Sequence, residues 1–160
     1  MIFHVSIESD DPRRTATALA EIWGGAALPF PPVGVGSWAA IADDGRGSMI
    51  EVYPRGTELH EGAGNDPVFG IQGTPRRNGP FHIAIGTRLD ADVVAAIARR
   101  NGWRAKYCRR EGRFGLIELW IDGCLMIEVL TPEMQEEYVA TVTLDNWRAM
   151  LDMAPEAAAA

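Results

Sequence analysis

Two stretches of the chain alternate between apolar and polar residues, and each is followed by a helical pattern. In residues 2–8, the apolar side chains of Phe3, Val5 and Ile7 point to one face. Residues 81–86 alternate in the same way. A period of two is typical of a β-strand that buries one face, so each stretch predicts a half-buried strand.

A helix is expected after each of these strands. Asp11 followed by Pro12 predicts the start of the first helix, because an aspartate cap and a proline both suit the first helical turn. Apolar residues then recur at helical spacing until Gly24, which predicts the end of the helix. In the second half, Asp90 is expected to cap a helix that ends near Asn101.

Further strands complete each half. In the first half, residues 36–42 and 48–53 predict two strands, and the connection before them is long enough to hold one more short strand. In the second half, strands are expected in residues 103–108, 114–121 and 124–130, the last two joined by an aspartate-glycine turn. Each half is therefore predicted to be a βαβββ module.

The repeat predicts an α+β fold with two modules in one structural domain. Residues 1–54 are assigned to the first module and residues 81–132 to the second. Residues 55–80 are rich in glycine, proline and polar residues, which predicts a linker or loop, long enough to serve as a lid over a cavity. Residues 133–160 are expected to form a helical extension with a frayed tail.

The halves also repeat a histidine in the first strand and a glutamate in the last. The segment FHVSI at residues 3–7 returns as FHIAI at 81–85, and MIEVYP at 49–54 returns as MIEVLTP at 126–132. Strand alternation places four polar side chains opposite the apolar stripes: His4, Glu51, His82 and Glu128. A carboxylate among buried neighbours needs a partner, because an unpaired buried charge is costly.

Two imidazoles and two carboxylates on one face suit a single divalent ion, such as Zn, Ni, Mn, Fe or Co. The alternative is a hydrogen-bonded polar cluster that persists from a duplicated ancestor without any metal.

Glu118 is a further candidate on the same face. Aligning the two hairpins matches it to Ala40 of the first half. Beside a metal it is expected to act as a general base with a pKa raised by an apolar cavity, and the alternative is a strand carboxylate paired with an arginine. Three aromatic residues are expected either to line a substrate pocket or to pack in the core: Trp38, Tyr53 and Trp120.

Charge and composition narrow the class of partner. The 160 residues carry a formal net charge of −7 and no continuous basic stripe. Both features argue against nucleic acid or an anionic membrane as a binding partner. No apolar run approaches the ~20 residues of a membrane-spanning helix. There is no signal-peptide pattern, and the two cysteines have no metal-motif spacing. A cytoplasmic location is therefore expected.

The duplicated βαβββ pattern and the matched histidine and glutamate segments resemble the vicinal oxygen chelate superfamily. This superfamily includes glyoxalase I, methylmalonyl-CoA epimerase, extradiol dioxygenases, fosfomycin-resistance proteins and bleomycin-binding proteins. The resemblance covers residues 2–132. It implies a cupped mixed sheet with the glyoxalase-like fold, a homodimer, and one divalent metal ion. The implied ligands come from the first and last strand of each module: His4, Glu51, His82 and Glu128.

A set of two histidines and two carboxylates resembles bacterial-type glyoxalase I. The resemblance implies a metal-dependent lyase, isomerase or epimerase whose small oxygenated substrate chelates the metal, while Glu118 or a displaced ligand carboxylate such as Glu128 moves the proton. Two alternatives remain open. One is a non-catalytic small-molecule-binding protein on the same fold, as in bleomycin resistance. The other is an extradiol-type dioxygenase.

Overall fold

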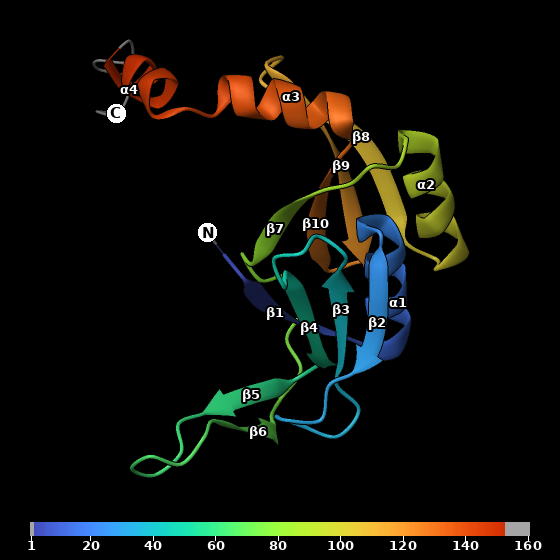
Figure 1. Ribbon diagram of the computed structural model, residues 1–160, viewed down its shortest axis with the longest axis vertical. Helices are drawn as coiled ribbons and strands as arrows, with labels where there is room; N and C mark the ends of the chain where they lie inside the picture. The colour runs from blue at the N-terminus through green and yellow to red at the C-terminus, as the bar shows by residue number, and fades with distance from the viewer. Residues whose placement is uncertain (1, 153–160) are drawn as a thin grey trace.

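The computed structural model describes residues 2–152 and contains two βαβββ modules (Figure 1). The first module consists of β1 (His4–Ser9), α1 (Pro12–Trp23), β2 (Gly25–Pro29), β3 (Trp38–Ala42) and β4 (Met49–Pro54). The second consists of β7 (His82–Gly86), α2 (Ala91–Arg100), β8 (Arg104–Arg110), β9 (Phe114–Ile121) and β10 (Leu125–Leu130). The predicted α+β fold and its duplicated element order are confirmed.

The segment between the modules is more ordered than a plain linker. It contains the strands β5 (Thr57–His60) and β6 (Phe69–Gln72), which pair antiparallel as a separate two-stranded sheet. Figure 1 shows this hairpin projecting away from both modules. A linker or loop was predicted here, and these two strands were not.

Two helices follow the second module, α3 (Pro132–Thr141) and α4 (Leu144–Asp152). Helix α3 packs against β9 and β10 at the end of the second sheet, whereas α4 extends away from the sheets in Figure 1. The expected frayed tail, residues 155–160, lies outside the described residues. The longest helix in residues 2–152 has 12 residues, and none of the helices described is long and apolar enough to cross a membrane.

The caps of α1 are those expected from the sequence. The Asp11 carboxylate accepts a hydrogen bond from the backbone N–H of Arg14 at 3.0 Å, and Gly24 follows the helix with φ of 74°. Asp90 also stands at the N-cap of α2, but its side chain makes no capping hydrogen bond. The start of α2 is therefore fixed by packing more than by its cap.

The two modules have the same sheet topology. The strand orders are β1-β4-β3-β2 and β7-β10-β9-β8, with the first and last strands of each module parallel. The register is also the same, because His4 pairs with Met49 and His82 pairs with Met126. The duplication seen in the sequence is therefore reproduced residue by residue in the sheets.

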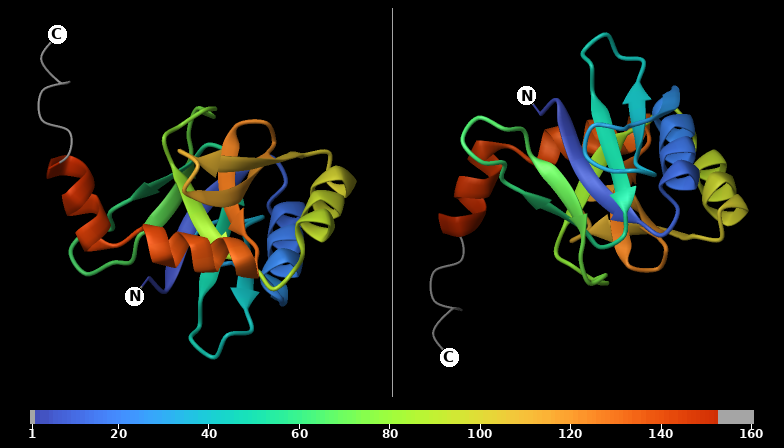
Figure 2. Two further views of the ribbon diagram at one scale, coloured as in Figure 1. Left: turned by 90° about the horizontal axis from the view of Figure 1, so that it is seen from above. Right: turned by 90° about the horizontal axis from the view of Figure 1, so that it is seen from below.

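The modules share one hydrophobic core. The buried cluster joins residues of both sheets with the buried sides of α1 and α2, which lie next to each other (Figure 2). Helix α1 also touches the second module directly. The Thr87 hydroxyl after β7 donates to the Ile22 carbonyl near the end of α1, and the Arg14 guanidinium in the first turn of α1 donates to Asp122 at 3.1 Å. Because α1 contacts both modules, the halves are held as one unit.

Candidate metal centre

The first pair of predicted ligands is brought together in the first module. His4 Nε2 lies 3.8 Å from Glu51 Oε1, with the carboxylate buried and the imidazole exposed. The other carboxylate oxygen, Oε2, accepts hydrogen bonds from the Ser6 hydroxyl at 2.8 Å and from the Tyr53 hydroxyl at 2.6 Å. Two donors therefore fix the Glu51 carboxylate and leave Oε1 directed towards the histidine.

Tyr53 is suited to this role as a donor. Burial, the hydrogen bond to Glu51 and the negative charge of Glu51 together raise the pKa of Tyr53 to about 12. The phenol therefore keeps its proton at neutral pH and continues to hold the carboxylate.

Two carboxylates meet in the second module. Glu118 on β9 pairs directly with Glu128 on β10, which places both side chains on one face. Arg110 bridges them, donating from Nη1 to Glu118 Oε1 at 3.0 Å and from Nη2 to Glu128 Oε1 at 2.6 Å. His82 lies on the neighbouring strand, exposed, with Nδ1 at 3.2 Å from the Pro80 carbonyl oxygen. In this arrangement, Arg110 is hydrogen-bonded to the carboxylate of Glu128, which the sequence predicts as a metal ligand.

The expected raised pKa of Glu118 is wrong. Burial does raise it, but hydrogen bonds from Lys106, Trp120 and Arg110 outweigh burial and hold the pKa of the carboxyl below its usual value. Lys106 Nζ lies at 3.1 Å from the carboxylate, and Trp120 Nε1 donates to it at 3.2 Å. The cavity around Glu118 is therefore not apolar, and the alternative of an arginine-paired strand carboxylate describes it better.

The alignment of the hairpins is also shifted by one residue. Glu118 pairs with Glu128, and in the first module Ala39 pairs with Glu51. The counterpart of Glu118 is therefore Ala39 and not Ala40, so the first module has an alanine where the second has a carboxylate. This substitution makes the two halves chemically unequal.

The two pairs of ligands remain separate within one chain. In residues 2–152, no three histidine, cysteine, aspartate or glutamate side chains are grouped in a way that would hold a metal ion. Glu51 lies on the sheet face opposite its buried neighbours Ile50 and Val52, and Glu128 likewise lies opposite Ile127 and Val129. Both pairs therefore point away from the shared core. The donor types still suit a divalent ion, and each module presents one imidazole and one carboxylate.

The three aromatic candidates do not share one face. Tyr53 contacts Glu51, and Trp120 contacts Glu118, so both lie on the polar faces. Trp38 pairs with Val52 on the helix side of its sheet, and the Arg13 guanidinium lies 5.2 Å from the centre of its ring. Trp38 is therefore a core residue in a cation–π contact, and the prediction that it lines a pocket with the other two does not hold.

Arg110 and Lys106 were not predicted as partners of the two glutamates. Strand β8 runs beside β9, with Lys106 directly opposite Glu118. The signal was the alternation along residues 104–110, which places Arg104, Lys106 and Arg110 on the same face of the strand.

Comparison with known proteins supports the fold, through solved structures of low sequence identity. No family model and no curated protein matches the chain. Among solved structures, the fosfomycin resistance protein FosX of Listeria monocytogenes is 13% identical, over 88% of this chain and 97% of that chain, with a TM-score of 0.55. Glyoxalase I of Leishmania major is 15% identical, over 96% and 99%, with a TM-score of 0.51. Lactoylglutathione lyase of Agrobacterium tumefaciens is 12% identical, over 81% and 91%, with a TM-score of 0.51.

These structural neighbours are members of the vicinal oxygen chelate superfamily, as the sequence resemblance predicted. The chain therefore has the glyoxalase-like fold. The Listeria FosX has also been solved as a mutant in complex with Mn(II) and 1S,2S-dihydroxypropylphosphonic acid.

Proposed function

We propose that this protein is a metal-dependent enzyme of the vicinal oxygen chelate type, acting on a small oxygenated substrate. One divalent ion would be held by His4, Glu51, His82 and Glu128. The observation that carries the proposal is the matched register: each module presents a histidine and a glutamate at equivalent positions of its first and last strands. The FosX structure with Mn(II) supports a divalent ion on this fold.

The proposed site is assembled from two copies of the chain. Within one chain, the His4 and Glu51 pair and the His82 and Glu128 pair lie on separate sheets, so the first module of one copy would face the second module of another. Leu28, which pairs with Ala39 on the polar face of the first sheet, is 52% exposed and available for such a contact. A homodimer in the cytoplasm is part of this proposal.

The chemistry proposed for the site depends on which carboxylates are held in place and which can be released. A bound divalent ion would polarise the vicinal oxygens of a substrate. Ser6 and Tyr53 keep the Glu51 carboxylate oriented. Glu128, in contrast, has to break its hydrogen bond with Arg110 before it can bind the metal. Because Glu118 has a lowered pKa and its charge is already matched, proton transfer is assigned to a displaced ligand carboxylate, Glu128, and Glu118 would hold the released Arg110.

A second function is favoured by one contact. The 2.6 Å pair between Arg110 and Glu128 supplies a positive charge where the metal would lie. A protein that has lost the metal and binds a small molecule without turnover would show this same arrangement. In that case Trp120 would matter for binding and the two histidines would not.

Metal analysis separates the two functions. We expect about one divalent ion per chain in the wild type and loss of the ion in Glu51→Ala and His82→Ala, since each change removes one ligand. His60→Ala is the matched control, because His60 lies on the projecting hairpin, and it should retain the metal. A wild type that takes up no metal after reconstitution would contradict the enzyme proposal and favour the binding protein.

Mixed dimers test the assembly of the site. When His4→Ala and His82→Ala copies are co-expressed with different tags and the mixed dimer is isolated, one of its two sites contains both changes and the other contains neither. We therefore expect one ion per mixed dimer and none in either single-variant dimer. A site confined to one chain would leave the mixed dimer as empty as its parents.

A further inference from the structure

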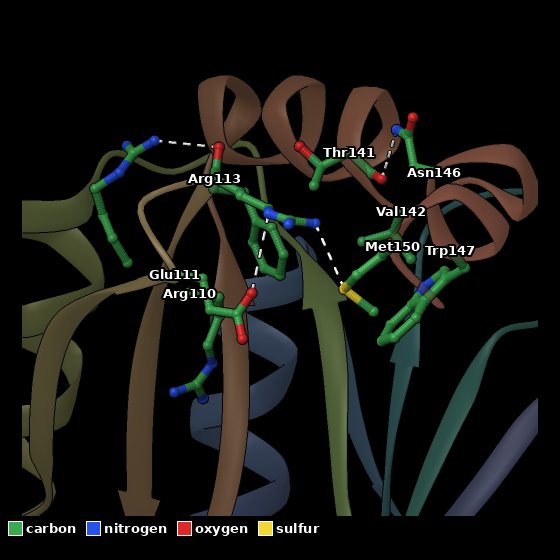
Figure 3. A pocket seen from close by; sticks show the side chains of 10 residues that line it. Arg110, Glu111, Arg113, Thr141, Val142, Asn146, Trp147 and Met150 are labelled. Carbon is green, nitrogen blue, oxygen red and sulfur yellow. Dashed lines mark hydrogen bonds and ion pairs between the residues drawn. The ribbon is translucent and has the colours of Figure 1, made fainter. Parts of the chain in front are cut away.

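A cavity lies outside the candidate metal centre, between the β8–β9 hairpin and the bend from α3 to α4 (Figure 3). Its volume is about 420 Å³, which is within the range of small-molecule sites. One wall is basic and comes from the hairpin: Arg109, Arg110 and Arg113. The other is largely apolar: Phe114, Val142, Trp147 and Met150.

The three arginines differ in how well their charge is matched. Arg109 pairs with Glu137 at 3.2 Å, and Arg110 pairs with both Glu118 and Glu128. Among the described residues 2–152, Arg113 has only Glu111 at 3.9 Å, at the limit of an ion pair, and a weak contact with the Met150 sulfur at 3.7 Å. Within the lining of this cavity, Arg113 therefore carries the positive charge that is most available to a ligand.

The apolar wall contains two aromatic rings, Phe114 and Trp147. The Phe114 ring is held by an edge-on contact with Tyr138, with ring centres 5.1 Å apart. Trp147 lies across the cavity on α4 and is 51% exposed, although a tryptophan normally buries most of its ring. In Figure 3, the Trp147 and Met150 side chains border the same space into which Arg113 points. A planar apolar group placed here would cover the exposed indole.

We propose that this cavity binds a small amphipathic carboxylate, with its carboxylate on Arg113 and its apolar body against Trp147. A guanidinium matches a carboxylate in geometry as well as in charge, and the facing wall disfavours a ligand that is polar throughout. The cavity shares Arg110 with the carboxylate pair of the second module, but neither Arg113 nor Trp147 belongs to the proposed metal centre, and occupancy of the cavity requires no metal.

Phenylacetate is the probe, titrated into metal-free protein by calorimetry and by tryptophan fluorescence. We expect saturable binding at millimolar concentration. Acetate, which lacks the apolar body, and 2-phenylethanol, which lacks the charge, should each bind about tenfold more weakly or worse, the equivalent of one charged hydrogen bond or one buried ring face. Equal binding of 2-phenylethanol and phenylacetate would overturn the assignment to an anion.

Matched variants locate the site. Arg113→Gln should weaken phenylacetate binding about tenfold, because it removes the charge but keeps a side chain of similar length. Arg148→Gln is the control, since Arg148 lies on the same helix as Trp147, is exposed and does not line the cavity. Trp147→Ala should abolish the fluorescence response and the binding, and Trp147→Phe should restore most of the binding. No saturable binding, or equal losses in Arg113→Gln and Arg148→Gln, would overturn the proposal.

Discussion

Asp10, Arg55 and Asp122 join three parts of the chain through one group of charges. Arg55 Nη2 lies 3.0 Å from Asp122 Oδ2, and both of these side chains are almost fully buried. Arg55 also donates to Asp10, which accepts a second bond from Arg77 at 2.8 Å. Asp10 belongs to the first module, the arginines to the segment between the modules, and Asp122 to the second module. The group therefore fastens the projecting hairpin to both halves.

Asp10 gives this group a pH dependence. Burial raises its pKa, but hydrogen bonds from Arg55 and Arg77 outweigh burial, so the folded-state pKa lies below the usual value of 3.8. The stabilisation is therefore present above the unfolded-state pKa and is lost as the pH falls through the folded-state pKa. Asp10→Asn should cost about 1 kcal/mol in urea unfolding at pH 7, a low value for charged hydrogen bonds because the Asp10 side chain is 40% exposed.

The difference between Asp10→Asn and the wild type should shrink when unfolding is repeated below pH 4. Asp43→Asn, a change at an exposed turn residue, should leave the stability within about 0.5 kcal/mol at both pH values. A wild-type advantage over Asp10→Asn that stays constant with pH would show that the ion pairs are not its source.

Single residues were predictable where strand alternation decides their position. Alternation placed His4 and Glu51 on one face, and the structure brings them into contact. Trp38 was selected for its aromatic ring and not from its register, which places it against the helix. The Arg110 bridge could not be predicted, because it depends on two strands that meet only in the folded sheet.

Two adjacent glycines at the junction of α1 and β2 are required for different reasons. Gly24 has φ of 74° with open space around it, so a side chain there meets only backbone strain. At Gly25, an added Cβ would lie 1.9 Å from the Ile41 carbonyl oxygen on the neighbouring strand β3. The contact is with backbone and not with a flexible side chain, so the strands would have to separate.

Gly25→Ala should therefore destabilise the protein much more than Gly24→Ala. We expect a loss of about 3 kcal/mol or more for the first change, in which a backbone clash has to be relieved, and about 1 kcal/mol for the second, in which only left-handed backbone is strained. Urea unfolding of the two variants side by side provides the measurement. Equal losses would mean that β2 can move away from β3 at little cost.

Elements with strong local signals were predicted close to their bounds. Helix α1 has both its aspartate cap and its terminal glycine. The hairpin of β5 and β6 was missed because each strand has four residues, and glycine and proline surround them. Short strands of this kind are determined by pairing with each other, which the sequence does not display.

The whole molecule depends on a core that neither module completes alone. Ile22 near the end of α1 is 1% exposed, and its carbonyl accepts the hydroxyl of Thr87 from the second module. A shared core of this size predicts one cooperative unfolding transition. Tryptophan fluorescence and far-UV circular dichroism should therefore give coincident urea curves, although Trp38 and Trp103 report on different modules.

The variant Ile22→Ala tests whether the two modules unfold in one transition. It should lower the free energy of unfolding by about 2–4 kcal/mol through the cavity that it leaves, while both probes still change together. Val139→Ala, at a position that is 70% exposed, should stay within about 0.5 kcal/mol of the wild type. Two separated transitions in Ile22→Ala would show that the modules unfold independently.

The place of α1 against both modules has a consequence for how the chain is made. During translation the first module leaves the ribosome before the strands of the second module exist. The side of α1 that α2 covers must stay in contact with water, or with a chaperone, until α2 has emerged. The duplicated halves therefore cannot mature one after the other, and a gene divided between them would have to deliver both fragments together.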